Sequence, residues 1–264
     1  MGYGGAEILL ANTIKSLPAY DHILCNVEQE ADDLNVHGHI VRSYDLGYRN
    51  IFSLPSVLIK LLKVIKHHNA SIIHAHLIPA VWIARIAWKL SKPSEFYFTI
   101  HSLLSKDPFE KNRLSLLIER LTYTRSQKVI AVSHTALEDY QRFIPIKGES
   151  LVIYNFVEDS FFNQKTITNN LHELQIVSVG NLKSSKNYLY LLDSLAIAKN
   201  YHLDIFGSGP ITSVVEKTVK KKNLNVNLKG KGNEMHKLLP VYDLFVSASL
   251  HEGYGIAVTE AMAC

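Results

Sequence analysis

The sequence is short of cysteine, proline, glycine and long apolar runs, and each shortage excludes a class of protein. Two cysteines in 264 residues provide neither a disulfide framework nor a metal-ligand spacing. The 13 glycines and 8 prolines are too few for a collagen-like or linker-rich chain. No apolar run approaches the roughly 18 residues of a membrane-spanning helix, and the first residues lack the pattern of a secretory signal. We therefore expect a cytoplasmic protein.

Charge is the next quantity in short supply. The formal net charge is only +4, which does not by itself indicate a nucleic-acid partner. One basic cluster lacks the interleaved aromatic side chains of a nucleic-acid site, so we interpret it as a solvated face and predict no nucleic acid. Its members are Lys217, Lys220, Lys221, Lys222, Lys229 and Lys231.

A second basic stretch, residues 54–68, has two interpretations. It carries Lys60, Lys63 and Lys66 among Leu, Val and Ile residues. Such a helix can lie on an anionic membrane surface, which would place the protein peripherally at the inner face of the membrane. Alternatively, the helix packs on a sheet and its lysines are solvated.

What the sequence does contain is a regular alternation of strand-like and helix-like segments. Short runs rich in Ile and Val are separated by longer stretches with apolar residues three and four apart, such as residues 54–65 and 112–123. This alternation predicts an α/β fold with parallel sheets covered on both faces. The predicted strands are residues 21–27, 39–44, 71–75, 95–100, 128–132, 151–154, 174–179, 203–206, 226–228 and 244–247.

A polar stretch without clear periodicity, residues 156–173, interrupts the alternation. We predict two α/β domains, residues 1–160 and 173–264, with a linker near 160–172; the alternative is a long surface loop within one domain. The glycine-rich loop at residues 2–5 has no preceding strand, and a helical pattern is still in progress at Cys264. We therefore expect a chain truncated at both ends, lacking the first strand of the N-terminal domain and the end of the C-terminal one.

The segment from His251 to Ala263 carries the most specific candidate site. Glu252 is followed by two glycines and then by a helical pattern that contains Glu260. A helix N-terminus suits a phosphate or a sugar hydroxyl, and carboxylates accept hydrogen bonds from vicinal hydroxyls. Taken alone, the pattern fits equally well a solvated glutamate before a helix and another within it.

Two further loops follow predicted strands. Gly180 and Asn181 end one strand, and Lys186 follows as a cation able to reach a phosphate. Gly207 and Gly209 end the next strand but lack the third glycine of a dinucleotide fingerprint. The acidic residue expected about 20 residues later is also missing, because that stretch is lysine-rich. These observations argue against a dehydrogenase.

Taken in order, these motifs resemble the retaining glycosyltransferases of the GT-B fold, family four. The N-terminal half agrees in the order of its motifs, so the resemblance covers essentially the whole chain. It implies two Rossmann-like domains with parallel sheets facing across a cleft, and transfer of a sugar from a nucleotide-diphosphate donor. The N-terminal motifs are residues 4–7, 73–76, 99–101, 130–133 and 152–157.

The resemblance also implies roles for individual residues. Glu252 matches the acidic residue on the donor sugar, Lys186 the cation on the diphosphate, and Glu260 the acceptor of ribose hydrogen bonds. His101 matches a histidine near the reacting carbon. The remaining donor-binding positions are Gly4, Gly5, Gly180, Asn181, Gly207, Gly253, Tyr254, Gly255 and Ile256.

One position departs from the family pattern: Asn181 stands where an arginine is usual. A neutral amide removes a positive charge and a bidentate fork, so Lys186, helped by Lys183, must supply the cation. For His74 and His76, alternation along a strand places both on one face without chemistry, and we expect no role for them.

The implied reaction needs no metal and no cofactor, since the departing phosphate takes the proton of the acceptor hydroxyl. The donor is UDP- or GDP-linked, and the acceptor is a saccharide or lipid-linked, as in bacterial surface polysaccharide or glycolipid synthesis. Two alternatives remain: a non-catalytic binding or scaffold protein of the same fold, and a nucleotide-sugar epimerase or hydrolase.

Overall fold

The computed structural model describes residues 5–28, 42–162 and 173–264. The described residues form two compact units, and the boundary between them in the sequence falls between Asn155 and Phe156. The short helix η3 (Asp159–Phe162) already belongs to the second unit, because Phe161 is buried there against Val177. Most of the expected linker, residues 163–172, lies outside the described residues.

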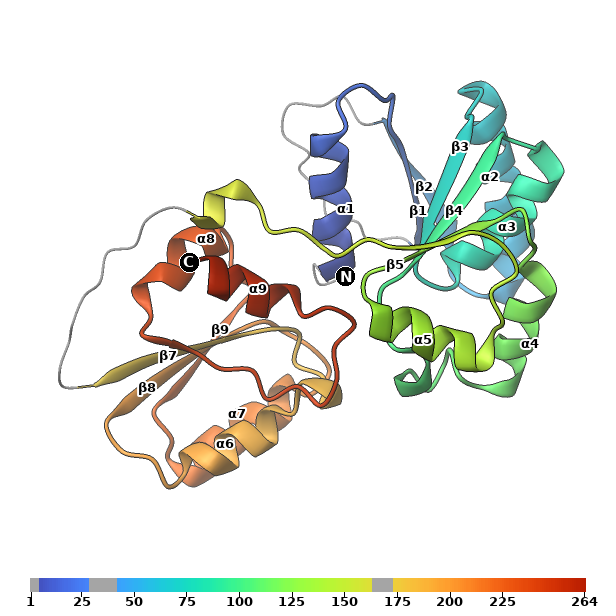
Figure 1. The fold of residues 1–264 in the computed structure, drawn as a ribbon. Coiled ribbons are helices and arrows are strands. Elements are labelled where there is room, and N and C mark those ends of the chain that lie inside the picture. The colour runs from blue at the N-terminus through green and yellow to red at the C-terminus, as the bar shows by residue number, and fades with distance from the viewer. Residues whose placement is uncertain (1–4, 29–41, 163–172) are drawn as a thin grey trace. The chain divides into compact units, whose positions relative to one another are not determined.

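Parallel strands form the centre of the first unit (Figure 1). One sheet has the strand order β3-β4-β5-β6, and β1 and β2 form a separate parallel pair. These strands are β1 (Ile23–Glu28), β2 (Arg42–Tyr48), β3 (Ile72–His76), β4 (Glu95–Ile100), β5 (Lys128–Ala131) and β6 (Ser150–Val152). The helices are α1 (Gly5–Ser16), η1 (Ile51–Ser53), α2 (Leu54–His67), α3 (Ala80–Ser91), η2 (Leu104–Lys106), α4 (Arg113–Thr122) and α5 (His134–Phe143).

The second unit repeats this architecture with the strand order β10-β7-β8-β9, again all parallel. Helices α6 and α7 lie on one face of its sheet, and α8 and α9 on the other (Figure 1). Its elements are β7 (Leu174–Val179), η4 (Ser184–Lys186), α6 (Tyr188–Leu195), β8 (Tyr201–Phe206), α7 (Thr212–Lys222), β9 (Val226–Gly230), α8 (Met235–Leu238), η5 (Leu239–Val241), β10 (Leu244–Phe245) and α9 (Ile256–Ala263). The predicted α/β class with parallel sheets is confirmed.

Successive residues of β7 explain why both faces of this sheet are covered. Ile176 belongs to the cluster under α6 and α7, and Val177 belongs to the cluster with η5 and α9. Neighbouring side chains on a strand point to opposite faces. A strand that is apolar at consecutive positions therefore needs helices on both sides.

Helix α2 packs its apolar side inward. Val57, Leu61 and Ile65 recur every four residues and are buried beside Leu46 of β2. Lys60 Nζ donates a hydrogen bond to the backbone oxygen of Leu46 at 3.1 Å. Of the two interpretations of residues 54–68, the helix packed on a sheet is the one that the structure adopts.

A buried polar cluster joins α3, α4 and α5. Arg85 of α3 is fully buried, and its Nη2 lies 2.7 Å from Glu119 Oε1 of α4. Glu119 also accepts hydrogen bonds from Trp82 Nε1, at 2.6 Å, and from the hydroxyl of Tyr140 in α5. The guanidinium lies 4.3 Å from the ring centroid of Phe98 in β4. This cluster fixes three helices to the sheet.

Two expectations about the chain ends meet different outcomes. Gly5 is the first residue of α1 rather than part of a loop, and Gly4 lies outside the described residues. Helix α9 starts at Ile256, as expected from the sequence. No helix in the described part of the chain is long and apolar enough to cross a bilayer.

Candidate active site

Three loops of the second unit are hydrogen-bonded to one another through their backbones. Gly180 N, directly after β7, donates to Phe206 O at the end of β8, at 2.9 Å. Leu182 N donates to Ser208 O at 3.0 Å, and Leu250 N donates to Ser185 O at 2.9 Å. The loops after β7, β8 and β10 therefore form one continuous frame at the carboxyl edge of the sheet, which is where ligands of α/β proteins bind.

Glycine is required where two of these loops approach each other. A Cβ atom on Gly207 would lie 2.0 Å from the backbone oxygen of Gly180. One on Gly209 would lie 2.3 Å from that of Leu182. Gly207 also has a φ of +144°, which few other residues adopt. The glycine pair is thus explained by loop packing.

Lys186 and Glu252 form an ion pair above this frame. Lys186 Nζ lies 2.5 Å from Glu252 Oε1, and the two side chains are 19% and 30% exposed. Beneath them, the Tyr188 hydroxyl donates to Gly180 O at 2.9 Å, and burial raises the pKa of Tyr188 to about 12. From the sequence, Lys186 was expected at the donor diphosphate and Glu252 at the donor sugar. The structure brings these two residues, 66 positions apart in the chain, into direct contact.

Helix α9 begins beside this pair. Gly255 adopts a left-handed conformation, with φ +84°. It lies next to Glu252, because a Cβ atom added to Gly255 would contact Glu252 Cγ at 3.7 Å. The first backbone N–H groups of a helix lack intrahelical acceptors, so Ile256 and its neighbours can bind an anion there. Gly253 and Tyr254 lie in the connecting loop.

Glu260 follows one turn into α9. Burial, with the nearby negative charge of Glu158, raises the pKa of Glu260 to about 7. The carboxyl group is therefore partly protonated near neutral pH. A hydroxyl-bearing ligand would find both a donor and an acceptor in this side chain.

Asn181 adds no charge to the frame, as expected from its amide. Lys183, the expected helper of Lys186, has an exposed side chain. The cation that contacts Glu252 is Lys186.

The first unit holds a separate group of histidines at the same kind of strand edge. The pairing of β3 with β4 sets His76 opposite Thr99, two residues before His101. His76 Nδ1 lies 2.9 Å from His101 Nε2, and His74 Nε2 lies 2.7 Å from Thr99 Oγ1. From the sequence we expected no role for His76. Its contact with His101 could not be predicted, because the contact depends on the register of β3 against β4.

The protonation of the pair follows from burial. Burial lowers the pKa of His101 to about 4 and holds that of His76 well below its usual value, so both rings are neutral. His76 Nε2 is buried without a hydrogen-bond partner. A buried N–H without an acceptor is rarer than an unused lone pair, so His76 carries its proton on Nδ1 and donates to His101. His101 then carries its own proton on Nδ1.

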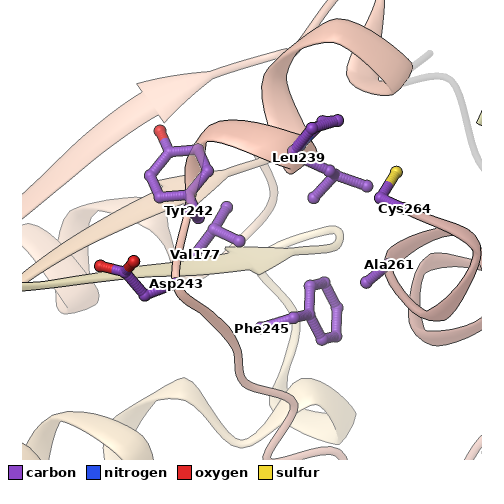
Figure 2. A pocket seen from close by; sticks show the side chains of 8 residues that line it. Val177, Leu239, Tyr242, Asp243, Phe245, Ala261 and Cys264 are labelled. Carbon is purple, nitrogen blue, oxygen red and sulfur yellow. The ribbon is translucent and has the colours of Figure 1, made fainter. Parts of the chain in front are cut away.

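A pocket lies at the far end of α9, between its last turn and β10 (Figure 2). None of the expected site residues lines this pocket. Its one carboxylate, Asp243, already accepts a hydrogen bond from Gln175 N at 2.9 Å. We assign it no ligand. The lining residues are Val177, Leu239, Pro240, Tyr242, Asp243, Phe245, Ala261 and Cys264.

The structure thus brings the expected donor-site residues Gly180, Lys186 and Glu252 together. It places His101 and Gly5 in the first unit. Across the described residues, no group of three or more His, Cys, Asp or Glu side chains is arranged to hold a metal ion.

Two units, each with a parallel sheet and helices on its faces, are the architecture of the GT-B glycosyltransferases. A crystal structure of Anabaena Alr3699/HepE in complex with UDP-glucose superposes with a TM-score of 0.83 at 18% identity, covering 99% of this chain and 75% of that one. At this identity the likeness shows the fold. The chain belongs to Glycosyltransferase Family 4, which matches residues 3–161, and residues 159–264 match the family Glycosyl transferases group 1.

Relatives with assigned names are also similar to this chain. The N-acetyl-alpha-D-glucosaminyl L-malate synthase of Bacillus anthracis is 24% identical over 87% of this chain and 64% of its own length. The Campylobacter jejuni N-acetylgalactosamine-N,N'-diacetylbacillosaminyl-diphospho-undecaprenol 4-alpha-N-acetylgalactosaminyltransferase is 28% identical over 59% of this chain and 45% of its own length. The chain therefore spans less than two thirds of either relative.

Proposed function

We propose that this chain acts as a retaining glycosyltransferase, moving a hexose-type sugar from a UDP- or GDP-linked donor to a hydroxyl of a saccharide or lipid-linked acceptor. The observation that carries the proposal is the partly exposed Lys186–Glu252 ion pair, set on a glycine frame beside the N-terminus of α9. A cation, a carboxylate and free helix amides are the groups that a sugar diphosphate needs.

Donor binding exchanges the partners of this ion pair. Lys186 Nζ turns from Glu252 to a phosphate oxygen, and Glu252 accepts hydrogen bonds from the sugar hydroxyls instead. The amides at the start of α9 bind the diphosphate, and Glu260 accepts from the ribose. Gly180 and Gly207 leave room for the donor, and Lys183 supplements the charge that Asn181 does not supply.

In the transfer step, the bond between the sugar C1 and the diphosphate oxygen breaks through an oxocarbenium-like state. The acceptor oxygen attacks C1 from the same face, and the departing phosphate takes the hydroxyl proton. The products are the nucleoside diphosphate and the new glycoside. The protein stabilises the leaving charge and positions the sugar, so this proposal includes no enzyme nucleophile, metal or cofactor.

We keep for His101 a role at the sugar, and for Gly4 and Gly5 a role at the phosphates, as the family resemblance implies. Because His76 donates to His101 Nε2, the nitrogen that remains for a sugar hydroxyl is the His101 Nδ1–H donor. The name of the Campylobacter jejuni relative includes a diphospho-undecaprenol acceptor, which supports a lipid-linked acceptor in surface-glycan synthesis at the inner face of a membrane.

Calorimetric titration of the purified chain with UDP, GDP and their sugar conjugates tests the donor site. We expect saturable binding of one nucleotide, weakened roughly tenfold or more in Lys186→Ala and in Glu260→Ala. Lys199→Ala, which removes an exposed lysine of the same unit outside these loops, is the matched control and should retain the affinity. Folded protein that binds neither nucleotide would contradict the proposal.

A second candidate is a non-catalytic member of the fold that binds a nucleotide sugar, and Asn181 favours it by removing a leaving-group cation. Incubation with the bound sugar nucleotide and a panel of acceptors separates the two. Glycoside formation supports transfer; binding without turnover supports the second candidate. Turnover without any acceptor would instead indicate a hydrolase or epimerase.

A further inference from the structure

Helix α4 is oriented opposite to the usual arrangement of an amphipathic surface helix. Three of its leucines face solvent: Leu114 is 66% exposed, Leu117 52% and Leu121 70%. Its buried positions are the polar residues Ser115 and Glu119. A helix that packs on a core normally buries its apolar stripe, so this one requires an explanation.

The buried polar cluster supplies the cause of this orientation. Glu119 is held by Arg85 of α3 and Tyr140 of α5, and Arg85 Nη1 also donates to Thr122 Oγ1 at 3.1 Å. These contacts fix the inward side of α4 without help from the leucines. The leucines are therefore free to serve a surface outside the unit.

The exposed leucines form one narrow stripe. At about 100° per residue, Leu114, Leu117 and Leu121 fall within an arc of roughly 60°. Arg113 and Arg120 follow along one edge of that arc. Phe109, in the turn before the helix, is a further exposed apolar side chain, at 55%. The combination of leucines, an aromatic residue and flanking arginines is typical of helices that lie in a membrane interface.

The charges beside the stripe are available to an anionic partner. The Arg120 guanidinium donates to Phe143 O at 2.8 and 3.2 Å, and Lys147 Nζ donates to Arg120 O at 3.1 Å. These acceptors are neutral carbonyl oxygens, so the positive charges are not cancelled. Lys111 and Arg113 are exposed as well, and no carboxylate among the described residues forms an ion pair with either.

We infer that α4 is the surface through which this chain lies on an anionic lipid bilayer. The leucines enter the boundary between headgroups and acyl chains, and Lys111, Arg113 and Arg120 contact the lipid phosphates. Helix α2, the candidate from the sequence, cannot offer an apolar face because that face is buried. This inference deepens the proposed function by bringing the chain to the surface that carries a lipid-linked acceptor.

A second copy of the chain fits this surface less well than lipid. The four exposed apolar side chains present a few hundred Å² at most, below the roughly 800 Å² per partner of a standard protein interface. Two copies meeting through α4 would also bring their arginines together, and like charges across an interface oppose association.

Co-sedimentation with vesicles tests the inference, using phosphatidylcholine alone and phosphatidylcholine with 30% phosphatidylglycerol as the two lipid surfaces. We expect the wild-type chain to bind the anionic vesicles, with weaker binding at high salt. Leu114→Gln/Leu121→Gln should lower that binding at least tenfold, and Lys111→Gln/Arg113→Gln should lower it and flatten its salt dependence. Glutamine keeps the helix propensity of the three positions within α4.

The matched control is Ile59→Gln/Leu90→Gln, which replaces two equally exposed apolar residues on α2 and α3, 53% and 62% exposed. It should bind vesicles like the wild type. Equal loss in this control, or no wild-type binding to anionic vesicles, would overturn the inference. So would an α4 variant that changes only the oligomeric state in sedimentation velocity.

Nucleotide titration of the same variants keeps the two proposals apart. The vesicle experiment contains no donor, so a chain that binds UDP but no vesicles loses the α4 inference and keeps the donor site. A chain that binds vesicles but no nucleotide keeps the α4 inference and loses the proposed donor site.

Discussion

The two units each contain an ion pair of nearly the same length but of different character. Arg85 and Glu119 are 2.7 Å apart with side chains 0% and 4% exposed, whereas Lys186 and Glu252 are 2.5 Å apart with 19% and 30% exposed. The first pair is enclosed by aromatic rings and shared with further hydrogen-bond donors. The second lies against the glycine loops and is partly open to solvent.

The comparison shows that distance alone does not define what an ion pair does. A fully buried charge that loses its partner cannot recruit water, so the first pair is locked into the fold. A pair that is partly open to solvent gains less stability and can exchange partners with a ligand at lower cost. We therefore treat Arg85–Glu119 as structural and propose Lys186–Glu252 as part of the donor site.

The strongest test of this contrast is Glu119→Ala, which leaves Arg85 buried and unpaired. We expect a loss of about 3–5 kcal/mol in the free energy of unfolding, measured by urea denaturation. The double variant Glu119→Ala/Arg85→Met should recover part of that loss, because the uncompensated charge is removed. A loss below about 1 kcal/mol for the single variant would remove the distinction between the two pairs.

The second pair should respond in the opposite way. Lys186→Ala should change the free energy of unfolding by less than about 1 kcal/mol. Its affinity for the nucleoside diphosphate should fall roughly 10- to 100-fold, because a charged hydrogen bond to phosphate is lost. Calorimetry and urea denaturation on the same preparation give both values. Unchanged affinity would show that the pair lies outside the donor site.

The pH dependence of nucleotide binding sharpens the assignment of the second unit. The pKa of Glu260 is raised to about 7, so its carboxylate, the form that accepts from two ribose hydroxyls, is lost as the pH falls through 7. Affinity should decrease by up to about tenfold per pH unit below that value. Stability runs the other way, because a raised carboxyl pKa disfavours the folded state as the pH rises toward 7. Glu260→Gln should flatten both profiles.

His76 tests a third polar contact, between two neutral rings. His76→Phe removes the donor that fixes the proton of His101 on Nδ1, while preserving ring volume. We expect turnover to fall about tenfold, the effect of losing one hydrogen bond, and nucleotide affinity to change little. His76→Gln, whose amide can donate again, should restore part of the rate. An equal effect on rate and affinity would indicate a merely structural role.

The smallest expected effect concerns competition within the second pair. Glu252→Gln frees Lys186 from its internal partner, so the affinity for UDP without a sugar should rise by up to about fivefold. The preference for the sugar conjugate over UDP should fall at the same time, because the carboxylate acceptor is missing. Weaker UDP binding in this variant would mean that Glu252 supports the nucleotide directly.

The sequence predicted local structure well where burial is uniform. The bounds of β4 (Glu95–Ile100) and β7 (Leu174–Val179) agree with the runs of apolar residues, because both faces of these strands are covered. Residues 112–123 were expected to be helical, as α4 is. Which side of α4 is buried could not be predicted, since Glu119 turns inward only because Arg85 of another helix meets it there.

Contacts between distant segments set the limit of prediction for the site. The sequence identified the glycine loops, Lys186 and Glu252 as candidate ligand-binding residues. It did not predict the direct contact between Lys186 and Glu252, which lie 66 residues apart in the chain. The His76–His101 contact depends on the register of β3 against β4, which periodicity does not fix.

The backbone frame of the second unit has a consequence for changing specificity by protein engineering. Its loops are joined main chain to main chain, from Gly180 to Phe206, Leu182 to Ser208 and Leu250 to Ser185. Such bonds do not depend on which side chains the partners carry, provided that Gly207 and Gly209 are kept. Libraries at Asn181, Ser208 and Tyr254 can therefore vary the chemistry presented to a sugar nucleotide while the scaffold that presents it stays constant.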